Sequence, residues 1–292
     1  MKVKEVINLI RPHQWIKNGF ILLPIFFSQK ITDWSLLKNA ILTLFAFCLT
    51  ASSIYCFNDI CDAAKDRLHP VKCKRPIASG SISSSVGLFI MAILIFFSFL
   101  LLSFTPEHHF LLYLTFLIYL VINVGYSLGI KNVSIVEMFV VASGFVIRIV
   151  AGALSTDTRP SNWIIIITFL LSLFLVIAKR RDDYLLIQKG GMNTRKSVAY
   201  YDLTFLNVTM TMVASITIVC YILYCVYGDE ISNHSDNMYV TSLFVIIGFL
   251  RYMQISIVKK TSANPALILL HDHFLQIDIL LWLSSLFLIL YV

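Results

Sequence analysis

Long uncharged runs alternate with short charged segments along the whole chain. An α-helix needs about 20 apolar residues to cross a bilayer, and lipid-exposed backbone must satisfy its hydrogen bonds internally. No alternating barrel pattern is visible. The pattern therefore predicts an all-α integral membrane protein with about nine transmembrane helices. Five runs lack Asp, Glu, Lys and Arg (39–57, 82–104, 108–130, 160–178 and 203–228), and four weaker candidates are 18–29, 132–155, 238–258 and 274–292.

Composition supports this interpretation. Of the 292 residues, 58% are hydrophobic and only 13% are charged, whereas about a quarter of a soluble domain is charged. A soluble enzyme is therefore excluded. No low-complexity linker interrupts the runs, so we expect residues 1–292 to form a single membrane-embedded domain.

The basic residues indicate the orientation. With the N-terminus in the cytoplasm, 19 of the 23 Lys and Arg residues fall on the cytoplasmic side. Lys30, Lys38 and Arg159 fall opposite, and Arg148 lies within a span. This asymmetry follows the positive-inside rule. The net charge of +7 therefore need not imply nucleic acid, and we expect a multi-pass protein of the plasma (inner) membrane.

A block of carboxylates follows the first uncharged run. Asp59, Asp62 and Asp66 are spaced i, i+3 and i+7, which places them on one stripe of a helix. Such carboxylates repel one another unless a cation lies among them, and Mg²⁺ is held by carboxylates together with substrate phosphates. Bases follow that could bind phosphate oxygens. The alternative is a solvated polar loop, since charge runs are commonly solvated. The bases are Arg67, Lys72, Lys74 and Arg75.

Two further sets of charges have open interpretations. Lys179 and Arg180 begin the second long cytoplasmic connection. They either bind an anion at the membrane rim or are the basic residues that the positive-inside rule requires at this position. Glu137 and Arg148 lie within one predicted span, where charges are costly and usually face a polar cavity. Either Glu137 and Arg148 form an ion pair with each other, or Arg148 binds a phosphate group of the substrate.

Polar residues at two helix ends have similar alternatives. Lys17 and Asn18 lie at the start of the first apolar stretch. They either anchor the helix at the membrane interface or reach into a cytoplasmic cleft. Tyr126 ends another span and is either an interfacial tyrosine or a hydroxyl donor to phosphate.

The Asn58, Asp59, Asp62 and Asp66 set resembles the NDxxDxxxD signature of the UbiA superfamily of intramembrane prenyltransferases. Matches in order along nearly the whole chain resemble one branch most, the decaprenyl-phosphate phosphoribosyltransferases. They are residues 11–18, 66–72, 75–80, 126–128, 144–148, 179–180, 264–265, 269–272 and 275–276.

One departure from the broader superfamily concerns the second connection. Aromatic prenyltransferases carry a DxxxD motif in this connection. In this chain the connection begins with the basic residues Lys179 and Arg180 and contains no DxxxD motif. Phosphoribosyl diphosphate and a polyprenyl phosphate bring more phosphate groups than a prenyl diphosphate does. Lys and Arg bind phosphate oxygens without a metal, so the bases favour the phosphoribosyl branch.

The resemblance implies transfer of 5-phosphoribose from phosphoribosyl diphosphate to a polyprenyl phosphate of the decaprenyl type, with diphosphate released. The product would supply a lipid-linked pentose for cell-envelope glycan synthesis. The site would be at the cytoplasmic rim, and homo-oligomerisation stays open. Mg²⁺ would be bound by Asn58, Asp59, Asp62 and Asp66, and substrate by Lys17, Asn18, Arg67, His69, Lys72, Arg75, Tyr126, Arg148, Lys179 and Arg180.

Two other functions remain open. An aromatic or quinone-pathway prenyltransferase shares the fold and the first motif, but the second DxxxD is missing here. A non-enzymatic transporter or lipid flippase accounts for the spans but not for carboxylates and bases clustered at one rim.

Overall fold

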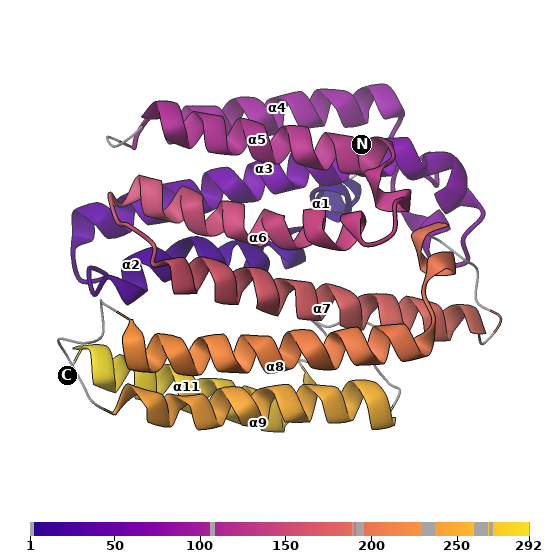
Figure 1. The fold of residues 1–292 in the computed structure, drawn as a ribbon. Coiled ribbons are helices and arrows are strands. Elements are labelled where there is room, and N and C mark those ends of the chain that lie inside the picture. The colour runs from indigo at the N-terminus through magenta and orange to yellow at the C-terminus, as the bar shows by residue number, and fades with distance from the viewer. Residues whose placement is uncertain are drawn as a thin grey trace. The chain divides into compact units, whose positions relative to one another are not determined.

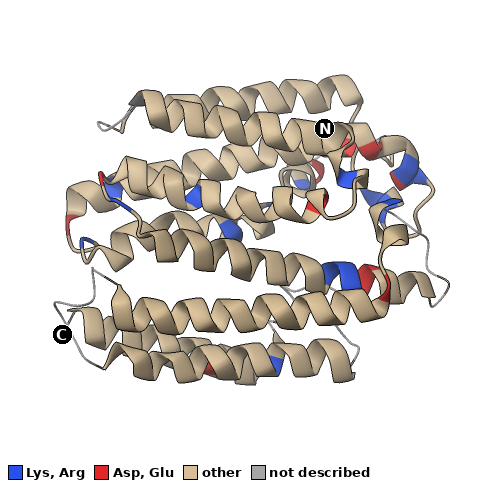
Figure 2. Ribbon diagram, viewed as in Figure 1, with Lys and Arg blue, Asp and Glu red and all other residues tan. Residues whose placement is uncertain are grey.

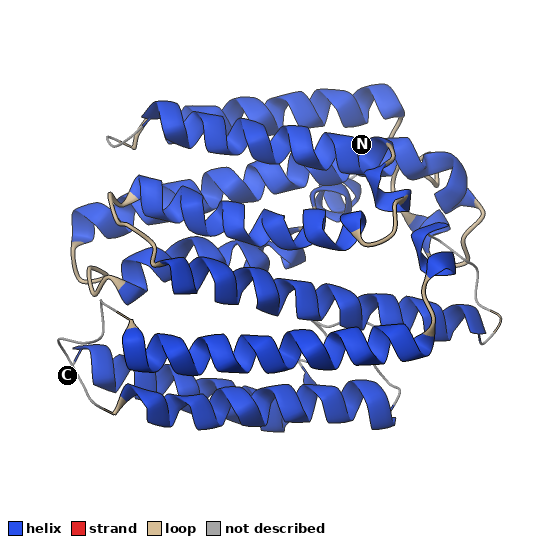
Figure 3. Cartoon of the chain, in the orientation of Figure 1, coloured by secondary structure: helices blue, strands red, loops and turns tan. Residues whose placement is uncertain are grey.

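The computed structural model describes residues 3–105, 109–188, 190, 196–228, 237–259, 268 and 271–291. Within these residues the structure is helical and contains no strand (Figure 3), which confirms the all-α prediction. The α-helices are α1 (Val3–Ile10), α2 (Leu23–Phe27), α3 (Trp34–Arg67), α4 (Ser84–Leu102), α5 (His109–Leu128), α6 (Val136–Ser155), α7 (Asn162–Gln188), α8 (Leu203–Tyr227), α9 (Ser242–Met253) and α11 (His273–Tyr291). Shorter 3-10 and π elements are η1 (Pro12–Leu22), η2 (Lys72–Lys74), η3 (Ile130–Asn132), η4 (Lys196–Tyr200), η5 (Met238–Thr241) and η6 (Gln254–Lys259).

Eight helical segments of the described chain are long and apolar enough to cross a bilayer. The remaining predicted span, residues 18–29, lies instead in η1 and the five-residue helix α2. Its geometry has local causes: Arg11 adopts a left-handed conformation (φ 52°), and a proline lies in the first turn of each element. Among the described residues the count of nine is thus not reproduced, and the cytoplasmic N-terminus stays a prediction.

Helix α3 carries the carboxylate block beyond the apolar run. Asp33 caps its start by accepting hydrogen bonds from the backbone N–H groups of Ser35 (2.9 Å) and Leu36 (3.3 Å). Its 34 residues span about 51 Å, more than the roughly 30 Å hydrocarbon core. Because the helix continues unbroken to Arg67, Asp59, Asp62 and Asp66 lie on a helix. The polar-loop interpretation of these residues is wrong.

The chain forms two compact units. The first comprises residues 1–133 and 146–160, and the second comprises residues 134–145 and 161–292. In the first unit α3 packs along α4 and α5, and η1 lies against α3 (Figure 1). The prediction of a single domain stays a prediction.

The first unit is held together around α3. The N-terminal segment is tied to this helix, because the indole N–H of Trp15 donates to Ser52 Oγ (3.0 Å) and Ser52 Oγ donates to the carbonyl of Ile10 (2.7 Å). An apolar cluster lies along α3, and burial of such side chains drives the packing. Its members are Ile21, Ala46, Phe47, Ile54, Leu102, Leu112, Phe116, Tyr119 and Ala151.

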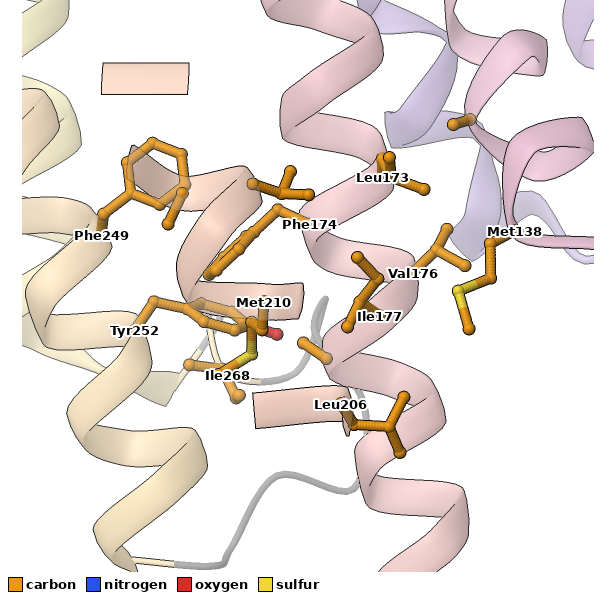
Figure 4. Packing of buried hydrophobic residues seen from close by; sticks show 14 of the residues in the cluster. Met138, Leu173, Phe174, Val176, Ile177, Leu206, Met210, Phe249, Tyr252 and Ile268 are labelled. Atoms are coloured by element: carbon orange, nitrogen blue, oxygen red, sulfur yellow. The ribbon is translucent and has the colours of Figure 1, made fainter. Parts of the chain in front are cut away.

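The second unit has its own core between α7, α8 and α9 (Figure 4). The Phe174 ring packs edge-on against Phe249 and Tyr252, with ring centroids 4.9 and 5.2 Å apart. Leu206 and Met210 extend from α8 into the same cluster. In this unit α7 therefore supplies the apolar surface against which its neighbours pack.

Gly152 permits a close backbone approach in the first unit. A Cβ atom placed on it would lie 2.0 Å from the carbonyl oxygen of Ile21, so η1 and α6 meet here through backbone. Gly152→Ala should therefore lower the free energy of unfolding by about 3 kcal/mol, the upper end for overpacking, measured by thermal unfolding in detergent. Gly19→Ala is the matched control, because nothing lies within 4 Å of its added Cβ. Equal stability of both variants would contradict the close approach.

Candidate functional site

Carboxylates and bases gather at the end of α3 and in the loop after it (Figure 2). Asp59 and Asp66 are buried, at 1% and 4% exposed, and Asp62 is half-buried. Carboxylates are rarely buried unless they are paired. The stripe predicted from the spacing therefore exists, and its charges need partners.

Each carboxylate of the stripe has a basic partner. Asp59 Oδ1 accepts from Arg11 Nη2 at 2.5 Å, and Asp62 Oδ1 lies 2.6 Å from Lys131 Nζ. Arg75 Nη1 contacts Asp59 Oδ1 at 3.1 Å and Asp66 Oδ2 at 2.7 Å. These bases come from three different segments of the chain. Three negative charges thus face three positive ones.

Arg11 and Lys131 contact the stripe in the structure, and the sequence did not assign either of them to the candidate site. In the sequence Lys131 is one of the 19 Lys and Arg residues expected on the cytoplasmic side, whereas in the structure it is just 9% exposed. The guanidinium of Arg11 also stacks over the Tyr55 ring at 5.1 Å. Arg11 is the first residue of segment 11–18, one of the segments that carry the family resemblance, and this position could have indicated that Arg11 belongs to the site. Lys131 lies in a turn between two apolar runs, and nothing in the sequence there indicated a contact with the stripe.

Two residues that the sequence predicted to bind phosphate, Arg67 and His69, form hydrogen bonds with the backbone of the loop after α3. Arg67 Nε donates to the carbonyl of Ala78 at 3.2 Å. His69 Nδ1 accepts from the backbone N–H groups of Val71 (3.1 Å) and Lys72 (3.2 Å). Burial, followed by the ammonium of Lys72, lowers the pKa of His69, which favours the unprotonated Nδ1 that these bonds require. In the structure these side chains shape the loop, and their phosphate contacts stay predictions.

Asn58, Lys72 and Tyr126 are each half-buried. Asn58 precedes the first aspartate of the stripe on α3, and Lys72 begins η2. Tyr126 lies near the end of α5. Their predicted roles at the metal or at phosphate stay predictions.

A second polar cluster lies within the membrane-spanning part of the first unit. Arg148 Nε donates to Asn18 Oδ1 at 2.8 Å, and Arg148 Nη2 donates to the hydroxyl of Tyr119 at 3.3 Å. The guanidinium also lies over the Phe47 ring at 4.7 Å. Asn18 Nδ2 contacts Cys48 Sγ at 3.1 Å. The structure thus brings the predicted residues Asn18 and Arg148 together.

Lys17 lies beside this cluster and is half-buried. Burial, and then the positive charges of Arg148 and Arg11, lower the pKa of Lys17 to about 8. A lysine in the unfolded chain titrates near 10.5. Between these values the unfolded protein binds more protons than the folded one, so stability increases as pH rises.

We therefore predict that Lys17→Met is more stable than the wild type at pH 7. This advantage should shrink as pH rises from 8 to 10.5, because the wild-type ammonium loses its charge. Thermal unfolding in detergent across this range measures the difference between the two proteins. Lys30→Met, at an exposed position, should show no such trend. A pH-independent difference for Lys17→Met would contradict the assignment.

Arg180 is paired within the second unit. It forms a two-pronged ion pair with Glu137, with Nη2 to Oε2 at 2.7 Å, and Nη1 contacts Asp183 Oδ2 at 2.7 Å. The ion pair considered between Glu137 and Arg148 is thus replaced by one between Glu137 and Arg180, which come from α6 and α7. Lys179 is exposed. The predicted substrate contacts of Lys179 and Arg180 stay predictions.

The C-terminal part of the resemblance is only partly described. Residues 264–265 and 269–270 lie outside the described residues. Asp272 accepts from the backbone N–H of Leu275 at 3.0 Å and pairs with Arg251, with Nη2 to Oδ2 at 2.7 Å. It therefore caps the start of α11 and ties it to α9.

A sequence model of the UbiA prenyltransferase family matches residues 20–286 of the chain. The chain belongs to this family. The prediction made from the NDxxDxxxD signature is thereby confirmed.

Relatives within the UbiA family match nearly the whole chain. The decaprenyl-phosphate phosphoribosyltransferase of Mycolicibacterium smegmatis is 30% identical over 97% of this chain and 91% of its own length. The protein of that name from Mycobacterium tuberculosis H37Rv is 31% identical over 97% and 93%. The fold is similar to that of a UbiA homolog from Archaeoglobus fulgidus bound to GPP and Mg²⁺, with a TM-score of 0.74, 20% identity and coverage of 99% and 100%.

The stripe of this UbiA-family chain has the ligand chemistry of a Mg²⁺ site. Asp59 Oδ2 is buried with no hydrogen-bond partner, so it is an oxygen available to a ligand. Within the described residues no three His, Cys, Asp or Glu side chains converge as a ready-made cage. Mg²⁺ commonly uses one or two carboxylates, with substrate phosphates and water completing its shell. The residues present therefore fit a metal that arrives with a diphosphate.

Proposed function

We propose that this protein transfers 5-phosphoribose from phosphoribosyl diphosphate to a polyprenyl phosphate, in a Mg²⁺-dependent reaction that releases diphosphate. The observation that carries the proposal is the number of bases in the first unit. Arg11, Arg75 and Lys131 balance the three aspartates of the stripe, and Lys17 and Arg148 add further positive charge. A prenyl diphosphate has a single anionic head, whereas these two substrates have three phosphate-bearing groups between them.

The transfer breaks one bond and forms one bond. An oxygen of the polyprenyl phosphate attacks the anomeric carbon of the ribose, and the bond from that carbon to diphosphate breaks with its electron pair leaving on diphosphate. The lipid phosphate is already an oxyanion at neutral pH. The protein therefore needs no strong general base, and positioning and electrostatic stabilisation supply the rate.

Asp59, Asp62 and Asp66, with Asn58, would hold Mg²⁺. When bound there, Mg²⁺ would act as a Lewis acid that stabilises the leaving diphosphate. Arg75 and Lys131 contact these carboxylates directly, so they lie within reach of an anion bound at the stripe. Lys and Arg bind phosphate oxygens in charge-assisted hydrogen bonds.

Arg67 and His69 contribute by holding the loop after α3. Their bonds to Ala78, Val71 and Lys72 fix the backbone that carries Lys72 and Arg75. We place the site on the cytoplasmic side of the plasma (inner) membrane, where a soluble phosphosugar is present. This placement rests on the distribution of Lys and Arg along the chain.

The proposal is tested with purified protein in nanodiscs containing polyprenyl phosphate, supplied with Mg²⁺ and ribose-labelled phosphoribosyl diphosphate. We expect label in the organic phase, and none when Mg²⁺ is removed with EDTA. A parallel reaction contains a prenyl diphosphate and an aromatic acid. Prenylation of the acid, with all ribose label remaining in the aqueous phase, would overturn the proposal in favour of an aromatic prenyltransferase.

A further inference from the structure

Arg11 has a backbone conformation that is unusual for its residue type. Helix α1 ends at Ile10, and Arg11 lies in the left-handed region, with φ 52° and ψ 61°. Helices often end on a left-handed residue, but that residue is usually glycine, because a Cβ atom is disfavoured there. Pro12 follows, and a residue before proline prefers an extended backbone. The conformation of Arg11 therefore costs free energy, and contacts with the rest of the fold must maintain it.

One buried serine of α3 holds the chain around Arg11. The hydroxyl of Ser52 donates to the carbonyl of Ile10 (2.7 Å) and accepts from the indole N–H of Trp15 (3.0 Å). Ser52 is 0% exposed. One of these bonds lies directly before Arg11 and the other lies four residues after it, so Ser52 fixes the chain on both sides.

The same face of α3 also fixes the side chain of Arg11. Ser52, Tyr55 and Asp59 are spaced i, i+3 and i+7, which continues the stripe of aspartates toward the start of the helix. The guanidinium lies over the Tyr55 ring, 5.1 Å from its centroid, and its Nη2 donates to Asp59 Oδ1 at 2.5 Å. One face of α3 therefore sets both the backbone of Arg11 and the position of its charge.

Arg11 binds one oxygen of Asp59 and leaves the other available. Asp59 Oδ1 accepts from Arg11 and Arg75, whereas Asp59 Oδ2 is buried with no hydrogen-bond partner among the described residues. Carboxylates that bind a metal are commonly oriented by hydrogen bonds of their own. A guanidinium has five N–H donors, and within the described residues only Nη2 of Arg11 donates to the protein. Arg11 can therefore hold Asp59 and an anion at the stripe at the same time.

The charges at the stripe determine which ligand fits it. Its three carboxylates are balanced by Arg11, Arg75 and Lys131, so the stripe is close to neutral. A free divalent cation would be repelled by these bases about as strongly as the carboxylates attract it. A divalent cation that carries a diphosphate is negatively charged overall, and arginine binds phosphate oxygens in charge-assisted hydrogen bonds. Arg11 therefore favours the complex of cation and diphosphate and disfavours the free cation.

We propose that Arg11 makes the stripe select a divalent cation bound to diphosphate over the free cation, and that Ser52 and Trp15 are the positioning residues that hold it there. The inference rests on the proposed function for the source of the diphosphate, which is the phosphoribosyl donor. Among the described residues neither Ser52 nor Trp15 hydrogen-bonds to a carboxylate. Both act through the backbone around Arg11.

The test measures binding without turnover, by isothermal titration calorimetry in phosphatidylcholine nanodiscs. One titrant is Mg²⁺ alone, and the other is preformed Mg²⁺–diphosphate. Arg11→Met should raise the dissociation constant of the complex roughly tenfold or more, because a charged hydrogen bond is lost. The same variant should lower the dissociation constant of Mg²⁺ alone about threefold, because a repelling charge is removed.

Ser52→Ala should shift both dissociation constants in these same directions, by roughly fivefold for the complex. In the Arg11→Met background it should add nothing, because the side chain that it positions is gone. Ser53→Ala is the matched control and should bind both titrants as the wild type does. Ser53 is equally buried, but its hydroxyl donates to the carbonyl of Thr50 on its own helix. Trp15→Phe removes only the indole N–H and replaces Ser52→Ala if that variant does not fold.

Three results would overturn the inference. Equal weakening of both titrants in Ser52→Ala would mean that Ser52 only supports the fold. Additive effects of Ser52→Ala and Arg11→Met would mean that Ser52 acts through another residue. Wild-type binding of both titrants by Arg11→Met would mean that Arg11 confers no selectivity.

These outcomes are independent of whether phosphoribosyl transfer occurs. If transfer fails but Arg11→Met and Ser52→Ala shift the two dissociation constants in opposite directions, the selectivity stands and the proposed reaction falls. If transfer occurs and both variants bind both titrants normally, the selectivity falls alone.

Discussion

Asp62→Asn should abolish turnover while leaving the protein folded. Asp62 is half-buried on the last turns of α3 and has one oxygen bonded to Lys131. Asparagine keeps the shape of the side chain but removes the charge that would hold Mg²⁺ against the diphosphate. Loss of this electrostatic stabilisation should lower kcat by roughly 10³-fold or more. The measurement is the rate of ribose-label transfer, with thermal unfolding of the same sample to verify the fold.

Asp59→Asn should have the same effect on kcat, with a larger effect on stability. Asp59 is almost fully buried and bonds to both Arg11 and Arg75, so its neutralisation leaves two guanidinium groups less compensated. Asp33→Asn is the matched control on the same helix. Asp33 caps the start of α3, and asparagine caps about equally well. Full activity of Asp59→Asn and Asp62→Asn would show that the metal assignment is wrong.

Arg180→Met should cost the protein more stability than any other single change considered. The substitution leaves the carboxylate of Glu137, which is 0% exposed, without its two-pronged partner. Breaking a buried pair from one side costs about 3–5 kcal/mol. Thermal unfolding in detergent should therefore show a strongly lowered midpoint for the single variant.

The double variant Glu137→Leu, Arg180→Met should recover much of the loss. It removes both charges, and apolar replacement of a buried pair is often close to neutral. Arg251→Met is the control. It breaks the ion pair with Asp272, which is partly exposed, so we expect little effect. If the double variant were as unstable as Arg180→Met, the ion pair would not be the source of the effect.

The sequence predicted the parts of the structure that depend on local pattern. Uncharged runs gave the membrane helices, and the i, i+3, i+7 spacing gave the carboxylate stripe of Asp59, Asp62 and Asp66. Both follow from helix periodicity, which any helical sequence must obey. The predicted membrane helix at residues 18–29 was wrong, because Pro12, Pro24 and the left-handed Arg11 produce a 3-10 segment in place of a long helix.

Pairings between distant segments could not be predicted from the sequence. Arg11 and Lys131 lie 48 and 69 residues from the aspartates they contact, and no local pattern encodes these distances. Glu137 illustrates the same difficulty. Its spacing from Arg148 suggested a partner on its own helix, but the structure supplies Arg180 from α7. Tertiary packing decides such choices.

The measurement that tests the central claim most directly follows two labels in one reaction. Phosphoribosyl diphosphate carries ¹⁴C in the ribose ring and ³²P in the diphosphate, and the protein acts on it in nanodiscs with polyprenyl phosphate and Mg²⁺. The account predicts that ¹⁴C enters the lipid while ³²P leaves as free diphosphate in equal amount. Both labels in the lipid, or neither, would contradict phosphoribosyl transfer.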